Sequence, residues 1–213
     1  MKRIDLNQAW GQGILYGITD AHLFGGSCAE AAKALVLAGV SWVQYRAKGL
    51  DLATQRAELK DLIPWVRAQG AYLLVNDSVE LAQELGADGV HLGQGDMEPQ
   101  KARALLGPYA ILGWSTHNLA QVQSAQGMDL DYLGVGPAFP TQTKPAEPVV
   151  GLDFLGQASL YSSLPLVAIG GIDLSRIKAV QKTGVRSVAM IQGLFEAPDL
   201  RARVQRIKER LAR

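Results

Sequence analysis

The sequence predicts an α/β protein of the (β/α)8 TIM barrel class, in which eight parallel strands alternate with eight helices. Short apolar runs rich in β-branched residues recur along the chain, and helix-like segments separate them. The same pattern joins several helices to the next strand: a glycine, a short turn and a buried run, as in G-A-D-G-V-H from Gly86 and G-V-R-S-V-A from Gly184. Because no dinucleotide-binding loop stands out, this repetition favours a closed barrel over a doubly wound open sheet.

We expect strands at 14–19, 40–45, 71–75, 110–114 and 166–169, and three more after the glycines at 86, 127 and 184. The expected helices lie at 26–38, 52–69, 78–85, 98–106, 118–126, 152–160, 173–182 and 199–211. Ser27 is expected to cap the first helix, and Pro64 to kink or break the second. We expect residues 1–213 to form a single domain, because this length is usual for such a barrel.

The composition argues against several classes of protein. The net charge is +1, from 21 basic and 20 acidic residues, so we expect neither a nucleic-acid nor a membrane partner. No apolar run could span a bilayer, and the start M-K-R-I-D-L-N-Q lacks the apolar core of an export signal. The single cysteine, Cys28, excludes an internal disulfide framework and fits a reducing cytoplasm. We therefore expect a cytoplasmic protein; a homo-oligomer is compatible with the sequence.

Polar and charged residues follow the predicted strands at their carboxyl ends, where the active site of a parallel barrel forms. Asp77 and Asp96 end two neighbouring strands, so the two carboxylates could share one hard cation such as Mg²⁺. Each aspartate could instead cap the following helix, but the pair together favours the metal. The other residues after the strands include Gln44, Arg46, Lys48, Asn76, Gln94, Ser115, His117, Thr141, Thr143, Lys144, Gly170-Gly171, Asp173 and Gln192-Gly193.

The cations and glycine turns in this set suit phosphate groups. Backbone amides of Gly170-Gly171 can hold a phosphate beside the helix expected from Asp173. Arg46, Lys48 and Lys144 add formal positive charge, more than one phosphate needs beside a metal ion. We therefore expect a diphosphate bound with Mg²⁺, and a second anionic group in the same barrel mouth.

The histidines give no sign of a catalytic base. His91 lies inside a predicted strand, where we expect a hydrogen-bonded residue of the barrel interior. His117 is expected to orient the loop after the fifth strand. No nucleophile–histidine pair stands out among the residues at the strand ends.

Six short motifs follow one another along the chain. They are Q-Y-R-A-K (44–48), N-D (76–77), H-L-G-Q-G-D (91–96), G-W-S-T-H (113–117), G-V-G-P-A-F-P-T-Q-T-K (134–144) and V-A-I-G-G-I (167–172). Together they resemble the thiamine-phosphate synthase family over nearly the whole chain. The resemblance implies a transferase of thiamine biosynthesis. It would join 4-amino-2-methyl-5-hydroxymethylpyrimidine diphosphate to a thiazole phosphate, releasing pyrophosphate. The implied mechanism is dissociative, so it needs strong stabilisation of the leaving group and no general base.

The resemblance also implies roles for individual residues. Asp77 and Asp96 match the Mg²⁺ ligands of the family. The positions that hold the pyrimidine diphosphate are matched by Gln44, Arg46, Lys48, Asn76, Ser115 and Lys144, and the thiazole phosphate site by Thr141, Thr143, Gly171, Ile191 and Gln192. Among these, Arg46, Lys48 and Lys144 would be catalytic, because fixed cations stabilise departing pyrophosphate.

Two other functions stay open at this point. A related thiazole tautomerase shares the barrel, but it tends to carry a histidine where this chain has Gly136-Pro137 and to lack the T-x-T-K run at 141–144. A non-catalytic barrel that binds phosphorylated ligands is suggested only by Gln192-Gly193, where the family usually has serine-alanine. The fold alone does not separate these functions.

Overall fold

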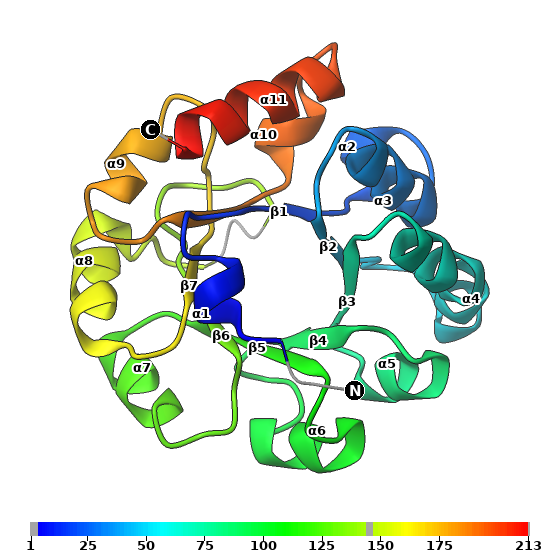
Figure 1. Cartoon of the computed structure of the whole chain (residues 1–213), viewed down its shortest axis with the longest axis horizontal. Helices are drawn as coiled ribbons and strands as arrows, with labels where there is room; N and C mark the ends of the chain where they lie inside the picture. The colour runs from blue at the N-terminus through cyan, green and yellow to red at the C-terminus, as the bar shows by residue number, and fades with distance from the viewer. Residues whose placement is uncertain (1–3, 144–146, 213) are drawn as a thin grey trace.

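The structure, a computed structural model, describes residues 4–143 and 147–212. In this part of the chain eight parallel strands close into a barrel, in which β1 pairs with both β2 and β8 (Figure 1). The strands are β1 (Leu15–Ile18), β2 (Trp42–Tyr45), β3 (Tyr72–Asn76), β4 (Gly89–Leu92), β5 (Ile111–Thr116), β6 (Tyr132–Val135), β7 (Leu166–Ala168) and β8 (Ser187–Met190). The predicted (β/α)8 barrel is therefore confirmed.

Helices surround the barrel and cover its outer, apolar face (Figure 1). They are α3 (Cys28–Leu37), α4 (Leu52–Ala68), α5 (Val79–Leu85), α6 (Pro99–Leu106), α7 (Leu119–Ala125), α8 (Gly151–Tyr161), α9 (Ile177–Gln181) and α11 (Leu200–Leu211). Each overlaps a helix expected from the sequence. The short helices α1 (Leu6–Ala9), α2 (Ala21–Phe24) and α10 (Gln192–Phe195) are not predicted, because four residues are too few to show a helical period.

Two local expectations about helices have different outcomes. Ser27 caps α3 as predicted: its hydroxyl accepts from the Glu30 N–H at 3.0 Å, and the Glu30 carboxylate accepts from the Ser27 N–H at 2.8 Å. Pro64 lies inside α4, which continues to Ala68. Of the kink or break expected at this proline, the break is therefore wrong.

Aromatic side chains fill the amino-terminal end of the barrel. Helix α1, dark blue in Figure 1, lies across this end, and Trp10 directly after it packs inside. The Trp10 ring meets the rings of Trp42 and Tyr132 nearly edge-on, at 5.0 Å between centroids in both cases. Among the described residues, Trp10 Nε1 is the one buried side-chain polar atom without a hydrogen-bond partner.

A buried ion pair braces the same end of the molecule from outside. Asp131, directly before β6, accepts hydrogen bonds from the Leu112 N–H at 2.8 Å and from Arg103 Nη2 at 2.6 Å. The Arg103 guanidinium also donates to the carbonyls of Gly107 and Ala110. The side chains of Arg103 and Asp131 are only 9% and 4% exposed, respectively. The pair therefore ties α6 to the starts of β5 and β6.

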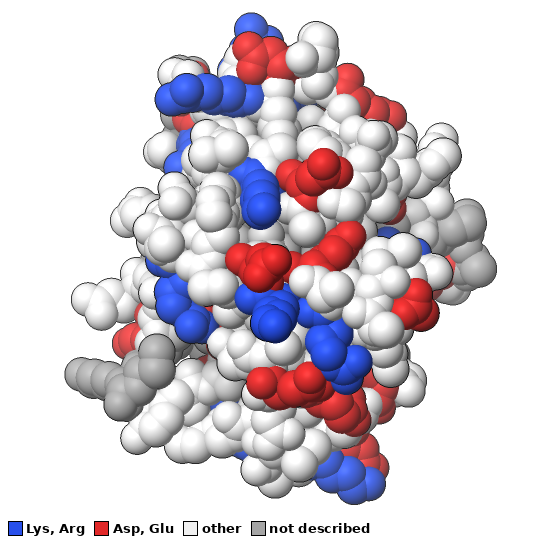
Figure 2. All heavy atoms as spheres, turned by 90° about the vertical axis from the view of Figure 1, so that its right-hand side faces the viewer, with Lys and Arg blue, Asp and Glu red and all other residues white. Residues whose placement is uncertain are grey.

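The outer surface carries charges of both signs. On the face shown in Figure 2, lysine and arginine side chains lie among aspartates and glutamates. Arg56 of α4 pairs with Glu84 of α5 at 2.7 Å, for example. This mixture agrees with the near-neutral net charge. In the described parts of the chain, none of the helices combines the length and hydrophobicity that crossing a membrane requires.

Removing the Asp131 carboxylate should leave the Arg103 charge buried without its main partner. Breaking such a pair costs about 3–5 kcal/mol, so Asp131→Ala should lower the free energy of unfolding by that amount in urea denaturation. The matched control is Asp129→Ala, because the Asp129 carboxylate lies 3.3 Å from the same guanidinium but is 54% exposed. The control should lose about 0–1 kcal/mol. Equal losses in the two variants would contradict this account.

Candidate active site

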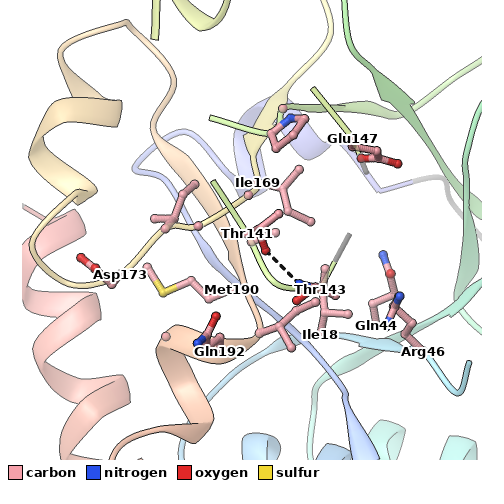
Figure 3. A pocket seen from close by; sticks show the side chains of 18 of the residues that line it. Ile18, Gln44, Arg46, Thr141, Thr143, Glu147, Ile169, Asp173, Met190 and Gln192 are labelled. Carbon is pink, nitrogen blue, oxygen red and sulfur yellow. Dashed lines mark hydrogen bonds between the residues drawn. The ribbon is translucent and has the colours of Figure 1, made fainter. Parts of the chain in front are cut away.

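A cavity of about 250 Å³ opens at the carboxyl ends of the strands. In Figure 3, Gln44 and Arg46 lie on one side, Asp173 and Gln192 lie on the opposite side, and Thr141 lies between them. The cavity gathers most of the residues singled out in the sequence: Gln44, Arg46, Asn76, Ser115, Thr141, Thr143, Gly171, Ile191 and Gln192. Their common location follows from barrel closure, which brings the ends of all strands to one mouth.

The end of β2 supplies a fixed cation to one side of the cavity. The Arg46 backbone N–H donates to Thr19 Oγ1 at 2.8 Å, and the same hydroxyl donates to the Arg46 carbonyl at 3.1 Å. The Arg46 side chain is 12% exposed, and its Nη1 lies 3.7 Å from Asp20 Oδ2. Because that distance exceeds a hydrogen bond, the contact with Asp20 does not occupy the donors of the guanidinium. They are suited to bind an anion in the cavity.

Asp77 and Asp96 meet beside the cavity, at the ends of β3 and β4. Their carboxyl groups lie within hydrogen-bonding reach of each other. Neither of them caps a helix, since Ser78 caps α5 by accepting from the Leu81 N–H, and Asp96 accepts from the Gly93 N–H at 2.7 Å. Asp77 also has a positive φ of 64°, which is rare outside glycine. The capping alternative weighed from the sequence is therefore wrong.

Lys48 joins this carboxylate pair at the rim. Its Nζ lies 2.5 Å from Asp77 Oδ2, and its side chain is 58% exposed. Burial acts to raise the pKa of Asp77, but the hydrogen bond from Lys48 and the contact with Asp96 outweigh it and lower this pKa. For Asp96, burial and the contact with Asp77 outweigh the backbone N–H of Gly93 and raise the pKa. Two carboxylates this close favour a shared proton or an added cation between them.

The donor set fits Mg²⁺ only with help from a ligand. Within residues 4–143 and 147–212, no group of three or more His, Cys, Asp or Glu side chains could hold a metal ion. Mg²⁺ often binds through one or two carboxylates and completes its shell with water and substrate phosphates. Asp77 and Asp96 match that arrangement, in which the ion arrives with a phosphorylated ligand.

The opposite side of the cavity is built by the turn after β7. Gly170 and Gly171 have positive φ values of 96° and 58°. A Cβ atom on Gly171 would collide with the carbonyl oxygen of Pro140, so only glycine lets these backbones approach. Arg176 donates to the Gly171 carbonyl, and its guanidinium lies 4.8 Å from the centre of the Phe139 ring. These contacts hold the turn against the loop after β6.

The helix expected from Asp173 begins later than predicted. The Asp173 carboxylate accepts from the N–H groups of Ser175 and Arg176 at 2.8 and 3.1 Å and closes a turn. Helix α9 then starts at Ile177. The expected helix N-terminus at Asp173 is therefore wrong, because a side-chain turn takes the place of the first helical residues.

The structure also shows residues that the sequence interpretation missed or placed differently. Arg176 and Glu147 line the cavity, and neither is a predicted site residue. The only signal for Arg176 is a charge three residues after Asp173, which a solvent-exposed helix would also give. His117 Nδ1 is 2.7 Å from the Gly136 carbonyl, so it orients the loop after β5 as expected. Lys144 lies outside the described residues.

Taken together, the fold and cavity define a (β/α)8 barrel whose mouth is suited to phosphorylated small molecules. The family described as thiamine monophosphate synthase matches residues 15–194, and the chain belongs to this family. It is 38% identical to the thiamine-phosphate synthase of Mycobacterium sp. (strain JLS) over 97% of this chain and 96% of that protein. It also superimposes on the thiamine phosphate pyrophosphorylase from Pyrococcus furiosus with a TM-score of 0.85 and 31% identity, over 95% and 97% of the two chains.

Some relatives are considerably longer. The thiamine-phosphate synthase of Prochlorococcus marinus (strain MIT 9303) is 41% identical over 80% of this chain, but the match covers only 48% of that protein. This chain thus spans about half the length of the first curated relatives that it matches, at 48% for each of the two P. marinus strains.

Removing the Arg46 guanidinium should weaken the binding of pyrophosphate. Hydrogen bonds to charged groups contribute about 1.5–3 kcal/mol, so we expect Arg46→Ala to raise the Kd about 10- to 100-fold in calorimetric titrations with Mg²⁺ present. The control is Arg56→Ala, because Arg56 pairs with Glu84 on the outer helices and does not line the cavity. Wild-type affinity in Arg46→Ala, or an equal loss in Arg56→Ala, would contradict this assignment.

Proposed function

We propose that this chain is a thiamine-phosphate synthase, which joins hydroxymethylpyrimidine diphosphate to a thiazole phosphate and releases pyrophosphate. The observation that carries the proposal is a single cavity with two different sides. One side carries a fixed guanidinium, Arg46, and the Asp77–Asp96 pair lies beside the cavity rather than in its lining. The other side offers hydroxyls and a glycine turn. This suits two phosphorylated substrates that react between the two sides.

In this proposal the pyrimidine diphosphate binds on the β2 to β5 side. Its ligands are Gln44, Arg46, Lys48, Asn76, Ser115 and Lys144. Arg46 and the two lysines stabilise the negative charge that develops on pyrophosphate as the C–O bond breaks. Asp77 and Asp96 would hold Mg²⁺, which neutralises part of the same charge when bound. The exposed Lys48 side chain, which pairs with Asp77, supports its role as a ligand at this rim.

The thiazole phosphate binds across the mouth in this proposal. Thr141, Thr143, Gly171, Ile191 and Gln192 are its ligands. Thr143 donates its N–H to Thr141 Oγ1 at 3.3 Å, so the loop after β6 holds these two residues together (Figure 3). Gln192 Nε2 donates one of its two hydrogens to Glu196 Oε1 at 2.5 Å, and we assign the phosphate to the backbone amides at this position.

The reaction between the two sides needs orientation more than acid–base chemistry. When the C–O bond breaks, the pyrimidine methylene carries the positive charge, and the thiazole nitrogen attacks it with its own lone pair. No proton has to leave that nitrogen, so no general base is needed there. The chain's task is to hold the nitrogen against the methylene carbon and to limit the access of water to the cation.

We further propose that the chain forms one barrel domain, acts in the cytoplasm and works without nucleic acid or membrane. The buried free thiol of Cys28 and the mixed surface charges support this setting. The site does not support the tautomerase alternative. A tautomerase binds no diphosphate, so it would not need the carboxylate pair or Arg46.

Purified protein should convert the two substrates to thiamine phosphate and pyrophosphate in equal amounts, and chelation of Mg²⁺ should stop the reaction. We expect Asp96→Asn to lose at least about 100-fold in kcat, since it removes a metal ligand but keeps an acceptor for the Gly93 N–H. The matched control is Asp129→Asn, an exposed aspartate at the other end of the barrel, which should keep its activity.

Two results would go against this proposal at different levels. Absence of thiamine phosphate at high enzyme concentration would exclude the synthase activity itself. Full activity in Asp96→Asn, with product formed by the wild type, would refute the metal assignment and leave the synthase function intact.

A further inference from the structure

A continuous chain of hydrogen bonds crosses the barrel interior beneath the cavity. Gln44 Nε2 donates to the Tyr16 hydroxyl at 3.3 Å, which lies 3.1 Å from the Tyr132 hydroxyl. The Tyr132 hydroxyl is 2.8 Å from His91 Nδ1, and His91 Nε2 is 2.9 Å from Ser115 Oγ. Gln44, His91 and Ser115 line the cavity, whereas both tyrosines are buried. These hydrogen bonds therefore connect two candidate substrate ligands, Gln44 and Ser115, through His91 and two tyrosines that do not line the cavity.

The chemistry of the donors decides which group donates in each of these hydrogen bonds. An amide nitrogen only donates, so the Tyr16 oxygen accepts from Gln44. The Tyr16 hydroxyl hydrogen then has an acceptor in the Tyr132 oxygen, and the Tyr132 hydrogen has one in His91 Nδ1. If Tyr132 donated to Tyr16 instead, the Tyr16 oxygen would accept twice. The buried hydroxyl hydrogen of Tyr16 would then lack an acceptor among these hydrogen-bonded residues.

Burial keeps both hydroxyl hydrogens in place. It raises the pKa of Tyr16 to about 12 and the pKa of Tyr132 well above its ordinary value. Both tyrosines are therefore neutral donors near pH 7. Their positions are also fixed by packing: the Tyr132 ring stacks on His91 with 5.4 Å between centroids, and a Cβ on Gly113 would collide with that ring.

The direction of the chain decides what Ser115 can do. With Nδ1 accepting from Tyr132, a neutral His91 carries its hydrogen on Nε2 and donates it to Ser115 Oγ. The Ser115 hydroxyl hydrogen is then left for a ligand in the cavity. An anionic ligand needs such a donor, whereas a serine that donated to the histidine would present only lone pairs.

We propose that Tyr132 is a positioning residue, which fixes the Nε2–H tautomer of His91 and thereby makes Ser115 a hydrogen-bond donor to the diphosphate-bearing substrate. The identity of that substrate rests on the proposed function. The tautomer and the direction of the chain do not, because they follow from the protein's own contacts.

The tautomer can be read directly by ¹⁵N NMR of protein labelled in its histidines, of which the sequence has only 3. We expect the wild-type His91 to carry its hydrogen on Nε2. Tyr132→Phe keeps the ring but removes the donor to Nδ1, so this preference should be lost. Tyr16→Phe should retain the Nε2–H form, because the Tyr132 hydroxyl still donates. The control Tyr45→Phe, which deletes a buried hydroxyl bound to Glu58 on the outer side of β2, should leave the His91 signals unchanged.

Kinetics test the consequence for the site. Tyr132→Phe should lower kcat/KM about 10- to 100-fold, by roughly as much as Ser115→Ala, and the double variant should lose little more than either single one. An Nδ1–H tautomer in the wild type, an unchanged tautomer in Tyr132→Phe or additive losses in the double variant would overturn the proposal. The wild-type spectrum tests the direction even where a variant does not fold. Absence of thiamine phosphate from the wild type would remove the proposed function, and affinity for pyrophosphate would then replace kcat/KM in this comparison.

Discussion

The pairing of β1 with β8 is the contact on which the rest of the molecule depends. It closes the sheet, so that residues as distant in sequence as Gln44, Ser115 and Gln192 line one cavity. Closure also gives the barrel interior two different ends. Aromatic rings around Trp10 fill the amino-terminal end, and the carboxyl end stays open for ligands. The path of the backbone therefore places the ligand cavity at the carboxyl ends of the strands, whichever side chains line it.

Tyr132 lies between these two ends and makes contacts toward each of them. Its ring packs against Trp10 in the apolar cluster, and its hydroxyl bonds to His91 beneath the cavity. A buried polar group is tolerated there because each hydrogen has an acceptor within a continuous chain. The same residue thus contributes to the stability of the barrel and, in our proposal, to the orientation of a substrate ligand.

Much of this arrangement could be predicted from the sequence. Apolar runs ending in Asp77 and Asp96 indicated neighbouring strands, and adjacency in a barrel then brings the two carboxylates together. The sequence could not show that Lys48 pairs with Asp77 or that Arg176 lies over Phe139, because both contacts depend on loop paths and side-chain rotamers. The three four-residue helices were not predicted from the sequence either. Helix α9 begins later than predicted because Asp173 closes a turn before it, and such a turn has no periodic pattern in the sequence.

The central claim is that the end of β2 and the Asp77–Asp96 pair form one site for a metal-bound diphosphate. It is tested most directly by a crystal structure with Mn²⁺ and pyrophosphate, because Mn²⁺ replaces Mg²⁺ and gives an anomalous signal. The account predicts one strong peak coordinated by Asp77 and Asp96, with pyrophosphate bridging from it to Arg46. A metal and pyrophosphate bound elsewhere, or pyrophosphate on Arg46 with no metal at the two aspartates, would contradict it.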